Sequence, residues 1–408
     1  MKDFKNQQNK NQYKQNIKNN GGAEAEQVCE MRRSCGGCQT WNLSYEEELS
    51  MKMGKLIRLL GRFGHVNEIL PMENPYHYRN KLQALFQYNG KNQFRYGIYQ
   101  SATKHIVKCD NCLIENKEAA RIVRTVAQQL TRLRIPAWDP AHKKGLFRHV
   151  MVRHAAADDS YMVVLVTASP TFAAGPDMAE EIVKKHPKVK SVIWCQNRTE
   201  TPLWMDSDGE VLYGTATITD KLADCLFRIS ARSFYQVNTV QTEKLYRTAL
   251  DYAELKPTDK VIDAYCGIGT IGIAAAKNYG CASVIGFDNN ENAVRDAGVN
   301  ARINGLENMT FHCADAGEIT AELAASGEEV QVLFADPPRA GLGREMLEAI
   351  DNIAPERMVY VSCNPETLAK DLEYLKKNAG YHVKKIQPVD MFPRTQHCEV
   401  VVQLARKG

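Results

Sequence analysis

The sequence lacks any uninterrupted apolar run long enough to cross a bilayer, and its amino terminus has no apolar signal core. A helical span needs about 20 consecutive apolar residues, and a secretory signal needs a shorter apolar segment near the start. No charge dominates either, since 52 lysines and arginines stand against 48 aspartates and glutamates, a net charge of +4. These absences argue against a membrane protein, favour the cytoplasm, and make charge weak evidence for a polyanionic partner. Nothing in the sequence indicates an obligate protein partner.

Cysteine is frequent, but not in the pattern of a small disulfide-bonded protein. Twelve cysteines are spread over 408 residues, whereas secreted disulfide scaffolds concentrate theirs in fewer than about 80 residues. Five occur early, as Cys29, Cys35, Cys38, Cys109 and Cys112. Spacing alone favours a zinc site on two CxxC pairs, Cys35 with Cys38 and Cys109 with Cys112. A 4Fe-4S cluster on Cys29, Cys35, Cys38 and Cys112 is the alternative.

Composition and patterning divide the chain into four parts. Residues 1–28 are rich in Asn, Gln and Lys and nearly free of apolar side chains. They cannot bury enough surface to offset the loss of conformational entropy, so we predict a disordered basic tail. Residues 29–72 hold the first cysteines and a helical pattern. Residues 73–232 contain short alternating runs that predict a β-rich central domain, and residues 233–408 form the last part.

The last part has the pattern of an α/β sheet. Seven apolar runs, KVIDAY, SVIGFD, MTFHCAD, VQVLFAD, RMVYVS, HVKKIQPVD and EVVVQLA, alternate with helical patterns over most of its length. Such alternation predicts a mostly parallel, doubly wound sheet. The predicted fold class is therefore α/β: a Rossmann-like domain with a seven-stranded sheet, preceded by a β-rich central domain with a cysteine cluster.

A glycine-rich turn follows the first of these strands. Gly267, Gly269 and Gly272 match G-x-G-x-x-G, and Asp288 lies about twenty residues further on, as in the dinucleotide-binding fingerprint. The turn lets the backbone approach a cofactor closely, and the acid binds ribose hydroxyls. Because any cofactor that carries adenosine has these groups, the turn alone favours a nicotinamide dinucleotide and S-adenosylmethionine about equally.

Polar residues follow three further strands of the predicted sheet. DPPR begins at Asp336, SCNP places Cys363 at a strand end, and Glu399 starts the last apolar run. We expect them to meet the glycine turn in one cleft, because ligands bind at the carboxyl ends of the strands in open α/β sheets. Hydride transfer does not generally need a thiol. Methylation of uracil at C5 does, because a thiolate that adds to C6 makes C5 nucleophilic, and a separate base must then remove the C5 proton.

Five motifs, in order along the chain, resemble those of the RNA (uracil-5-)-methyltransferases. They are FYQVN (234–238), DAYCGIGT (263–270), DPPRAG (336–341), YVSCNP (360–365) and DMFPRTQHCE (390–399). The early C-x5-C-G-G-C pattern with a distant cysteine is similar to the 23S ribosomal RNA branch, which carries a 4Fe-4S cluster. The resemblance implies methyl transfer from S-adenosylmethionine to C5 of a uridine in 23S rRNA, in a loop or single strand.

The resemblance also implies roles for individual residues. Cys363 would be the nucleophile that adds to C6, and Glu399 the base that removes the C5 proton. Phe234 and Arg339 are expected to shape the site of the target base. The implied S-adenosylmethionine pocket comprises Gln236, Tyr265, Thr270, Asp288, Asp315 and Asp336, and the implied cluster ligands are Cys29, Cys35, Cys38 and Cys112.

The sequence departs from the family in two respects. The acid after the second strand, usually Glu, is Asp288 here, and this shorter side chain still suits ribose hydroxyls. Many relatives begin with a TRAM domain, a small RNA-binding barrel, but only residues 1–28 precede Cys29, so we expect none. Three alternatives stay open: transfer RNA as the substrate, an NAD-linked iron-sulfur oxidoreductase, and a noncatalytic RNA-binding factor.

Several predictions concern local structure. Ser44 and Glu47 form a capping box before a helix, and Asn89-Gly90 suits a tight hairpin turn. A helix over residues 366–376 would direct its amino terminus at Cys363 and lower the pKa of that thiol.

Other predictions concern RNA contacts and helper residues. A flipped base is stabilised by aromatic and arginine side chains, and the candidates in the central domain are Tyr78, Arg79, Asn80, Lys81, Arg148, His149 and Arg153. We expect Asp263 to hold the glycine turn through hydrogen bonds. Asp315 is an equally good cap for the next helix.

Overall fold

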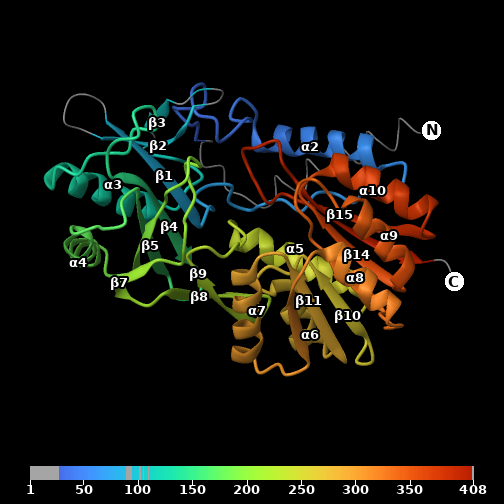
Figure 1. The fold of residues 1–408 in the computed structure, drawn as a ribbon. Helices are drawn as coiled ribbons and strands as arrows, with labels where there is room; N and C mark the ends of the chain where they lie inside the picture. The colour runs from blue at the N-terminus through green and yellow to red at the C-terminus, as the bar shows by residue number, and fades with distance from the viewer. Residues whose placement is uncertain (1–26, 89–93, 101–102, 104, 109, 407–408) are drawn as a thin grey trace.

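Two seven-stranded sheets organise the described part of the computed structural model, which comprises residues 27–88, 94–100, 103, 105–108 and 110–406 (Figure 1). The first sheet has the order β3-β2-β1-β4-β5-β6-β7 and is antiparallel apart from the pair β5 and β6. One face packs on two helices, α3 (Lys117–Arg132) and α4 (Gly175–Lys185). The strands are β1 (Lys81–Tyr88), β2 (Phe94–Tyr99), β3 (Ile106–Lys108), β4 (Phe147–Ala155), β5 (Ser160–Thr167), β6 (Val189–Gln196) and β7 (Glu210–Gly214).

The second sheet has the order β12-β11-β10-β13-β14-β16-β15. Its first five strands are parallel, and β16 runs antiparallel to both of its neighbours. This is the predicted seven-stranded α/β sheet, and the first sheet is the predicted β-rich region. The strands are β10 (Lys260–Ala264), β11 (Ser283–Asp288), β12 (Met309–Cys313), β13 (Val332–Ala335), β14 (Arg357–Ser362), β15 (Tyr381–Val389) and β16 (Glu399–Arg406).

Helices cover both faces of the second sheet because its strands are apolar on both sides. Neighbours such as Val261 and Ile262 belong to two different apolar cores, one on each face, as strand geometry requires. One face carries α5 (Thr239–Ala253), α6 (Thr270–Tyr279) and α7 (Glu291–Ile303). The other carries α8 (Ala316–Ala325), α9 (Gly343–Ile353), α10 (Pro365–Lys377) and the early helix α2 (Tyr45–Leu60).

A two-stranded ribbon, β8 (Thr217–Leu222) and β9 (Cys225–Ser230), connects the two sheets. Its buried apolar residues belong to one continuous apolar core that contains Met151 and Val164 of the first sheet and Val261 of the second. A shared core of this kind fixes the two sheets relative to each other, because opening it would expose apolar surface to water. The two sheets therefore keep a fixed position relative to each other.

Helix α2 begins at the predicted capping box. The Ser44 hydroxyl accepts a hydrogen bond from the Glu47 N–H at 3.2 Å, and the Glu47 carboxylate accepts one from the Ser44 N–H at 2.8 Å. The helix lies along α10 (Figure 1), and it buries Leu49, Leu56 and Leu60 in the core of the second sheet. The segment that precedes the central domain in sequence is thus packed against the carboxyl-terminal sheet.

Other local predictions are confirmed where the structure describes them. Strands β1 and β2 pair antiparallel as the predicted hairpin, while its turn at Asn89-Gly90 and residues 1–26 of the predicted tail lie outside the described residues. The domain limits at residues 72 and 232 stay predictions. Within the described residues, the structure contains no helix that is both long and apolar enough to cross a membrane.

Candidate active site

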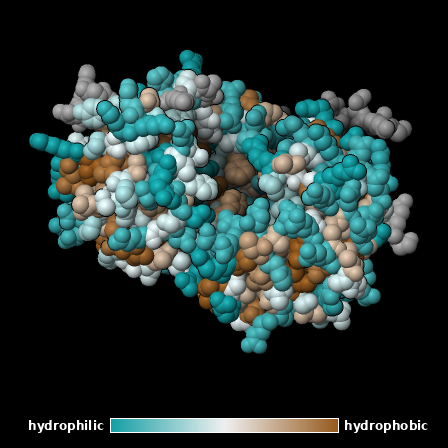
Figure 2. Space-filling view, in the orientation of Figure 1, coloured by the Kyte–Doolittle hydropathy of each residue, from teal (hydrophilic) through white to brown (hydrophobic). Residues whose placement is uncertain are grey.

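A cavity of about 770 Å³ opens between the two sheets. Figure 2 shows a hollow at the centre of this face, with apolar residues in its depth. Gly37, Arg79 and Phe234 line it from segments that precede the second sheet. Of the eight residues predicted to be catalytic or to bind the cofactor, seven line this one cavity: Gln236, Tyr265, Thr270, Asp288, Asp336, Cys363 and Glu399.

The glycine-rich turn after β10 forms one wall of the cavity. Gly267 and Gly269 have φ angles of 54° and 82°, which glycine adopts without strain. Asp263, only 1% exposed, accepts a hydrogen bond from the Gly272 N–H at 2.8 Å. A Cβ atom at Gly272 would lie 2.7 Å from that carboxylate oxygen, so glycine is needed where α6 passes β10. Asp263 holds the turn as predicted.

Asp288 and Thr270 reach the same wall from two elements. Oδ2 of Asp288 accepts a hydrogen bond from the Gly267 N–H at 3.1 Å, and Oδ1 accepts one from the Asn290 N–H at 2.8 Å. Oγ1 of Thr270 lies 2.9 Å from the hydroxyl of Tyr246, which also lines the cavity. The acid at the end of β11 is therefore oriented toward the turn, where the fingerprint requires it.

The remaining predicted pocket residues differ in position. Tyr265 adopts a φ of 61° and donates from its hydroxyl to the Leu342 carbonyl at 3.1 Å. Gln236 is 7% exposed, and its backbone carbonyl accepts a hydrogen bond from the Asn80 side chain at 3.0 Å. Asp315 caps α8, where Oδ1 accepts from the Gly317 N–H at 2.8 Å, and it is not among the residues that line the cavity. The capping alternative is thus observed, and a role for Asp315 in the pocket stays a prediction.

Cys363 and Glu399 come together because their strands are neighbours. Cys363 directly follows β14, and Glu399 is the first residue of β16. The two strands pair antiparallel with Ser362 opposite Val400, so one further step along the register places Cys363 opposite Glu399. Asp336 follows β13, the neighbour of β14 on its other side. Three adjacent strands therefore bring a thiol and two carboxyl groups to one end of the cavity.

Burial raises the pKa of all three groups. Burial alone raises the pKa of Asp336 to about 7. Burial and the charge of Asp336 raise the pKa of Glu399 to about 8, against the opposing effect of Arg339. Burial, then Glu399 and Asp336, raise the pKa of the Cys363 thiol to about 11, and Arg339 again opposes them. In the protein alone, Cys363 is therefore a protonated thiol at neutral pH.

The predicted lowering of the Cys363 pKa is wrong. Helix α10 does begin next to the thiol, with Pro365 in its first turn and Asn364 as its cap. A helix amino terminus favours a thiolate, but burial and two nearby acids act in the opposite direction, and the pKa of the thiol is raised. The acids belong to other strands, which the local sequence around Cys363 does not reveal.

Comparison with known proteins identifies the family. The pattern of the tRNA (uracil-5-)-methyltransferase family matches residues 44–407. The chain belongs to this family. An uncharacterised RNA methyltransferase of Caldanaerobacter subterraneus subsp. tengcongensis is 39% identical over 383 residues, which cover 93% of this chain and 84% of that protein. Another, from Halalkalibacterium halodurans, is 38% identical over 388 residues, covering 94% of this chain and 84% of that protein.

A solved structure supports the same assignment. The tRNA (uracil-54, C5)-methyltransferase of Pyrococcus abyssi, in complex with S-adenosyl-L-homocysteine, superposes with a TM-score of 0.77. It is 29% identical in sequence and covers 92% of this chain, which covers 86% of it. The present chain is therefore an RNA (uracil-5-)-methyltransferase that uses S-adenosylmethionine. This assignment decides against the nicotinamide interpretation of the glycine turn.

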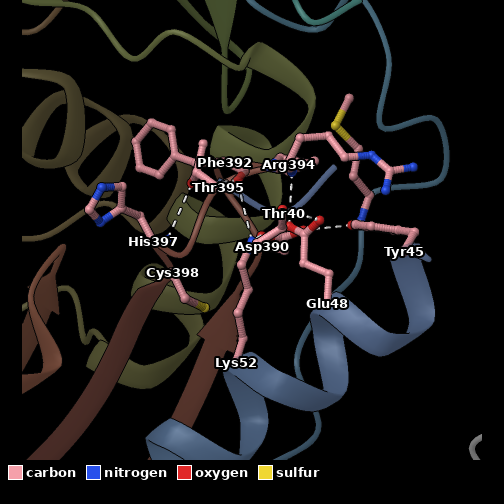
Figure 3. Close-up of polar contacts among 12 residues, drawn as sticks. Thr40, Tyr45, Glu48, Lys52, Asp390, Phe392, Arg394, Thr395, His397 and Cys398 are labelled. Carbon is pink, nitrogen blue, oxygen red and sulfur yellow. Dashed lines mark hydrogen bonds and ion pairs between the residues drawn. The ribbon is translucent and has the colours of Figure 1, made fainter. Parts of the chain in front are cut away.

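In this methyltransferase, buried charges hold the loop that leads to Glu399, residues 390–398 (Figure 3). Nζ of Lys52, on α2, lies 2.6 Å from Oε1 of Glu48 and 2.6 Å from Oδ1 of Asp390. The three side chains are at most 1% exposed. Nζ of Lys52 also donates to the Phe392 carbonyl at 3.2 Å. Burial opposes the charge of Lys52, but Asp390 and Glu48 outweigh it and raise the pKa of the ammonium group.

Arg394 connects this loop to the segment that carries the first cysteines. Its backbone N–H donates to Oε1 of Glu48 at 2.9 Å. Its guanidinium lies 4.7 Å from the ring centre of Trp41, a cation–π distance. Its carbonyl accepts from the Gln39 N–H at 3.1 Å. Because Gln39 directly follows Cys38, the cysteine segment and the loop before Glu399 share backbone contacts.

The four predicted cluster ligands lie near one another. Burial raises the pKa of Cys29, Cys35 and Cys38, and a thiolate at Cys112 raises each further. Among the described residues, however, no group of three or more His, Cys, Asp or Glu side chains is arranged to hold a metal ion. The thiols are therefore near one another, but the described residues do not show a cluster. Cys109, which the zinc alternative needs, lies outside the described residues.

Some predicted RNA contacts are wrong because the side chains are buried. Arg148, His149 and Arg153 are at most 5% exposed. Arg153 instead donates to the Ser233 carbonyl at 2.8 Å, and Arg148 donates to two backbone carbonyls. Tyr78 and Asn80 are buried as well. Of the predicted set, Arg79 lines the cavity, and Lys81 is partly exposed.

Sequence reasoning missed several residues of the site. Tyr246 lines the cavity from the middle of α5, where nothing in the local sequence marks it. Phe392, Thr395 and His397 also line it, and the motif DMFPRTQHCE contains all three. That motif was assigned only the base Glu399, although its polar and aromatic residues were a signal for a longer functional loop. Phe234, which was expected to shape the site, is 65% exposed at the cavity.

Proposed function

We propose that this enzyme transfers a methyl group from S-adenosylmethionine to C5 of a uridine in 23S rRNA through a covalent bond between Cys363 and C6, with Glu399 as the base. The observation that carries the proposal is the meeting of Cys363 and Glu399 in one cavity with the glycine turn. A nucleophile and a separate base, side by side at a cofactor pocket, are what this reaction requires.

Each step of the proposed reaction assigns one task to one group. Sγ of Cys363, as a thiolate, forms a bond to C6 of the uracil and pushes the electron pair toward C5 and O4. C5 then attacks the methyl group of S-adenosylmethionine; the bond between that methyl group and the positively charged sulfur breaks, and the sulfur keeps the electron pair and leaves as neutral S-adenosylhomocysteine. Glu399 removes the proton that remains on C5. The double bond reforms, and the bond between C6 and Sγ breaks to release the thiolate.

The raised pKa of Glu399 suits it as the base. A general base works best when its pKa lies near the working pH, and burial raises that of Glu399 to about 8. The pKa of Cys363, about 11 in the protein alone, opposes the first step. The positive charge of the methyl donor would favour the thiolate, because an opposite charge nearby stabilises the ionised form. Donor binding before thiolate attack follows from this electrostatic argument.

The cofactor pocket is proposed to comprise Gln236, Tyr265, Thr270, Asp288, Asp315 and Asp336. Asp288 suits the ribose hydroxyls, since its carboxylate already faces the glycine turn. Asp336 raises the pKa of both Cys363 and Glu399, so its carboxyl also lies close to the reacting groups. We propose that Asp336 lies where the methyl donor and the target base meet.

We propose that Cys29, Cys35, Cys38 and Cys112 hold a 4Fe-4S cluster. The donors are of the right chemical kind, because such clusters bind four thiolates, and Cys29, Cys35 and Cys112 all lie near enough to Cys38 to raise its pKa. The cluster would stiffen the segment that contacts Arg394, and methyl transfer requires no electron from it. Protein purified without oxygen should contain iron and sulfide in equal amounts. Stoichiometric zinc without colour would overturn this assignment.

The choice of 23S rRNA rests on the resemblance of the cysteine pattern to the ribosomal branch. Transfer RNA is the second candidate, favoured by the described substrate of the Pyrococcus abyssi relative. The test compares unmodified transcripts of 23S rRNA and of transfer RNA with labelled S-adenosylmethionine, followed by mapping of 5-methyluridine. Methylation of transfer RNA alone would overturn the ribosomal assignment.

The covalent step has its own test. RNA with 5-fluorouridine at the mapped position cannot lose a proton from C5, so a conjugate with the protein should accumulate. Peptide mapping should place the conjugate at Cys363, and Cys363→Ser should form none. If wild-type enzyme methylates ordinary RNA but forms no conjugate, the covalent mechanism is wrong.

A further inference from the structure

A second hollow adjoins the large cavity. Its volume is about 180 Å³, and it shares Cys363, Arg339 and His397 with the large cavity. The thiol therefore stands at the boundary between the two spaces. The rest of the wall includes Lys55 from α2, Glu366 from the first turn of α10, and Gln396 from the loop before β16.

Groups that can carry a positive charge outnumber acids around this hollow. Arg339 is exposed, and its Nη2 lies 3.5 Å from Nδ1 of His397, to which it can donate while the imidazole is neutral. Lys55 forms an ion pair of 3.1 Å with Glu366, in which both side chains are well exposed. Glu366 is the acid that lines the hollow.

The pKa of His397 is lowered by burial and by the positive charges around the hollow. Burial lowers its pKa, and Arg339, Lys52 and Lys55 lower it further. Lys52 also lines the hollow, but Glu48 and Asp390 already neutralise it. An anion between Arg339 and His397 would satisfy the guanidinium and allow the imidazole to accept a proton, because a nearby negative charge favours the charged form of histidine.

The geometry of a nucleotide indicates which anion this is. In the usual anti conformation of a pyrimidine nucleotide, the C6 edge of the base faces C5′ of the ribose and its phosphate. Under the proposed function, Cys363 bonds to C6 from one face of the ring, so the thiol lies beside the end of the base that is nearest the 5′ phosphate. The methyl donor lies toward C5. A phosphate on the C6 side would therefore enter the hollow beyond Cys363.

We propose that this hollow binds the phosphate on the 5′ side of the target uridine, with Arg339, His397 and Lys55 as its ligands. The inference rests on the proposed covalent function and adds a binding site to it. Arginine suits such a role because its planar guanidinium can donate to two phosphate oxygens at once. The site would hold the ribose so that C6 faces the thiol.

Replacing Glu366 should change RNA affinity in the opposite direction to replacing Lys55 or Arg339. A purely structural role of these residues would not predict this difference. Because the Glu366 carboxylate competes with the phosphate for Lys55, Glu366→Gln should strengthen RNA binding. Lys55→Gln and Arg339→Gln should weaken it. The salt dependence should follow, since each phosphate contact to a single strand contributes about −0.7 to the slope of log affinity against log salt concentration. Lys376→Gln is the matched control, because it removes a charge in the last turn of α10, the helix whose first turn carries Glu366.

The decisive experiment makes one linkage neutral. Synthetic RNA fragments that wild-type enzyme methylates are prepared with a methylphosphonate either 5′ or 3′ of the target uridine. For wild-type enzyme, the 5′ substitution should reduce kcat/KM by roughly ten- to a hundredfold more than the 3′ substitution, the factor of a charge-assisted hydrogen bond. For Arg339→Gln, the extra loss should shrink to about twofold or less, because the contact is already missing.

The outcomes separate this inference from the proposed function. Equal losses for the two linkages in wild-type enzyme, with ordinary RNA still methylated, would overturn the phosphate site and leave the methyltransferase mechanism standing. An extra 5′ loss of unchanged size in Arg339→Gln, His397→Gln and Lys55→Gln would overturn the assigned ligands. If neither 23S rRNA nor transfer RNA fragments are methylated, the proposed function fails, and this inference fails with it. Affinity for S-adenosylmethionine, measured for every variant, should stay at the wild-type value.

Discussion

Replacing Lys52 by methionine tests the buried charge network most directly. Lys52 bridges Glu48 on its own helix and Asp390, 338 residues away in the sequence, at 2.6 Å each. Methionine has nearly the same shape but no charge, so two carboxylates would remain in the core without their cation. Removing one partner of a buried ion pair costs about 3–5 kcal/mol of stability, and the low exposure of all three side chains places this site in that class.

The loss should depend on pH, and the sign follows from proton binding. Without Lys52, the folded protein can relieve the repulsion by protonating one carboxyl group, whose folded pKa is then raised above its unfolded value near 4. The folded state would bind more protons than the unfolded state, so stability falls as pH rises, by about 1.4 kcal/mol per pH unit for one proton. This slope applies between the unfolded pKa and the raised folded pKa. Lys52→Met should therefore be least damaging near pH 5 and most damaging near pH 8.

Urea unfolding at several pH values measures this effect. The control is Arg62→Met, which breaks an ion pair with Glu373 whose side chains are 57% and 41% exposed and should cost less than about 1 kcal/mol. Because the network holds the loop before Glu399, kcat should also fall, by up to about a hundredfold, with affinity for S-adenosylmethionine unchanged. A loss no larger than that of the control, or one that does not vary with pH, would refute the argument that Lys52 is a required buried counter-ion.

Three further predictions concern the thiol, the base and the glycine turn. Alkylation of Cys363 by iodoacetamide should still accelerate at pH 10 in the protein alone, and S-adenosylmethionine should lower the thiol pKa by on the order of one unit relative to uncharged S-adenosylhomocysteine; a plateau below pH 9 without ligand would contradict the raised pKa. Turnover should rise with pH up to about 8, as Glu399 loses its proton, and Glu399→Gln should reduce it by at least about a hundredfold while a methylated Cys363 conjugate accumulates; a flat pH profile would exclude Glu399 as the base. In thermal unfolding, Gly272→Ala should destabilise the protein by about 1–3 kcal/mol through crowding against Asp263. The control Gly298→Ala in α7 should be neutral or slightly stabilising, because its added Cβ meets nothing closer than 3.7 Å. Similar losses of stability for both variants would disprove the close approach at Gly272.

The contacts of Arg394 suggest why the early segment and the last loop depend on each other. The guanidinium lies against the ring of Trp41, and the backbone N–H binds the same Glu48 that pairs with Lys52. A change in the cysteine segment would thus be transmitted to the loop that ends at Glu399. The segment that precedes the central domain in sequence supports the active site from outside the catalytic sheet.

Features that depend on neighbours in the chain were readable from the sequence. The capping box of Ser44 and Glu47 needs a spacing of three residues, and the glycine turn needs glycines where φ is positive. The position of Cys363 at a strand end follows from an apolar run that stops at a polar turn. In each case the interaction that fixes the structure lies within a few residues, so local pattern is sufficient evidence.

Other properties were decided by the tertiary structure. The pKa of Cys363 depends on Asp336 and Glu399, which arrive on other strands, so local reasoning about α10 gave the wrong sign. Arg148 and Arg153 looked like RNA ligands, but both are buried and donate to backbone carbonyls of segments distant in the sequence. The hollow beside Cys363 also exists only where α2, α10 and the last loop meet. Burial and electrostatic fields are sums over groups distant in sequence, and folding alone determines which groups those are.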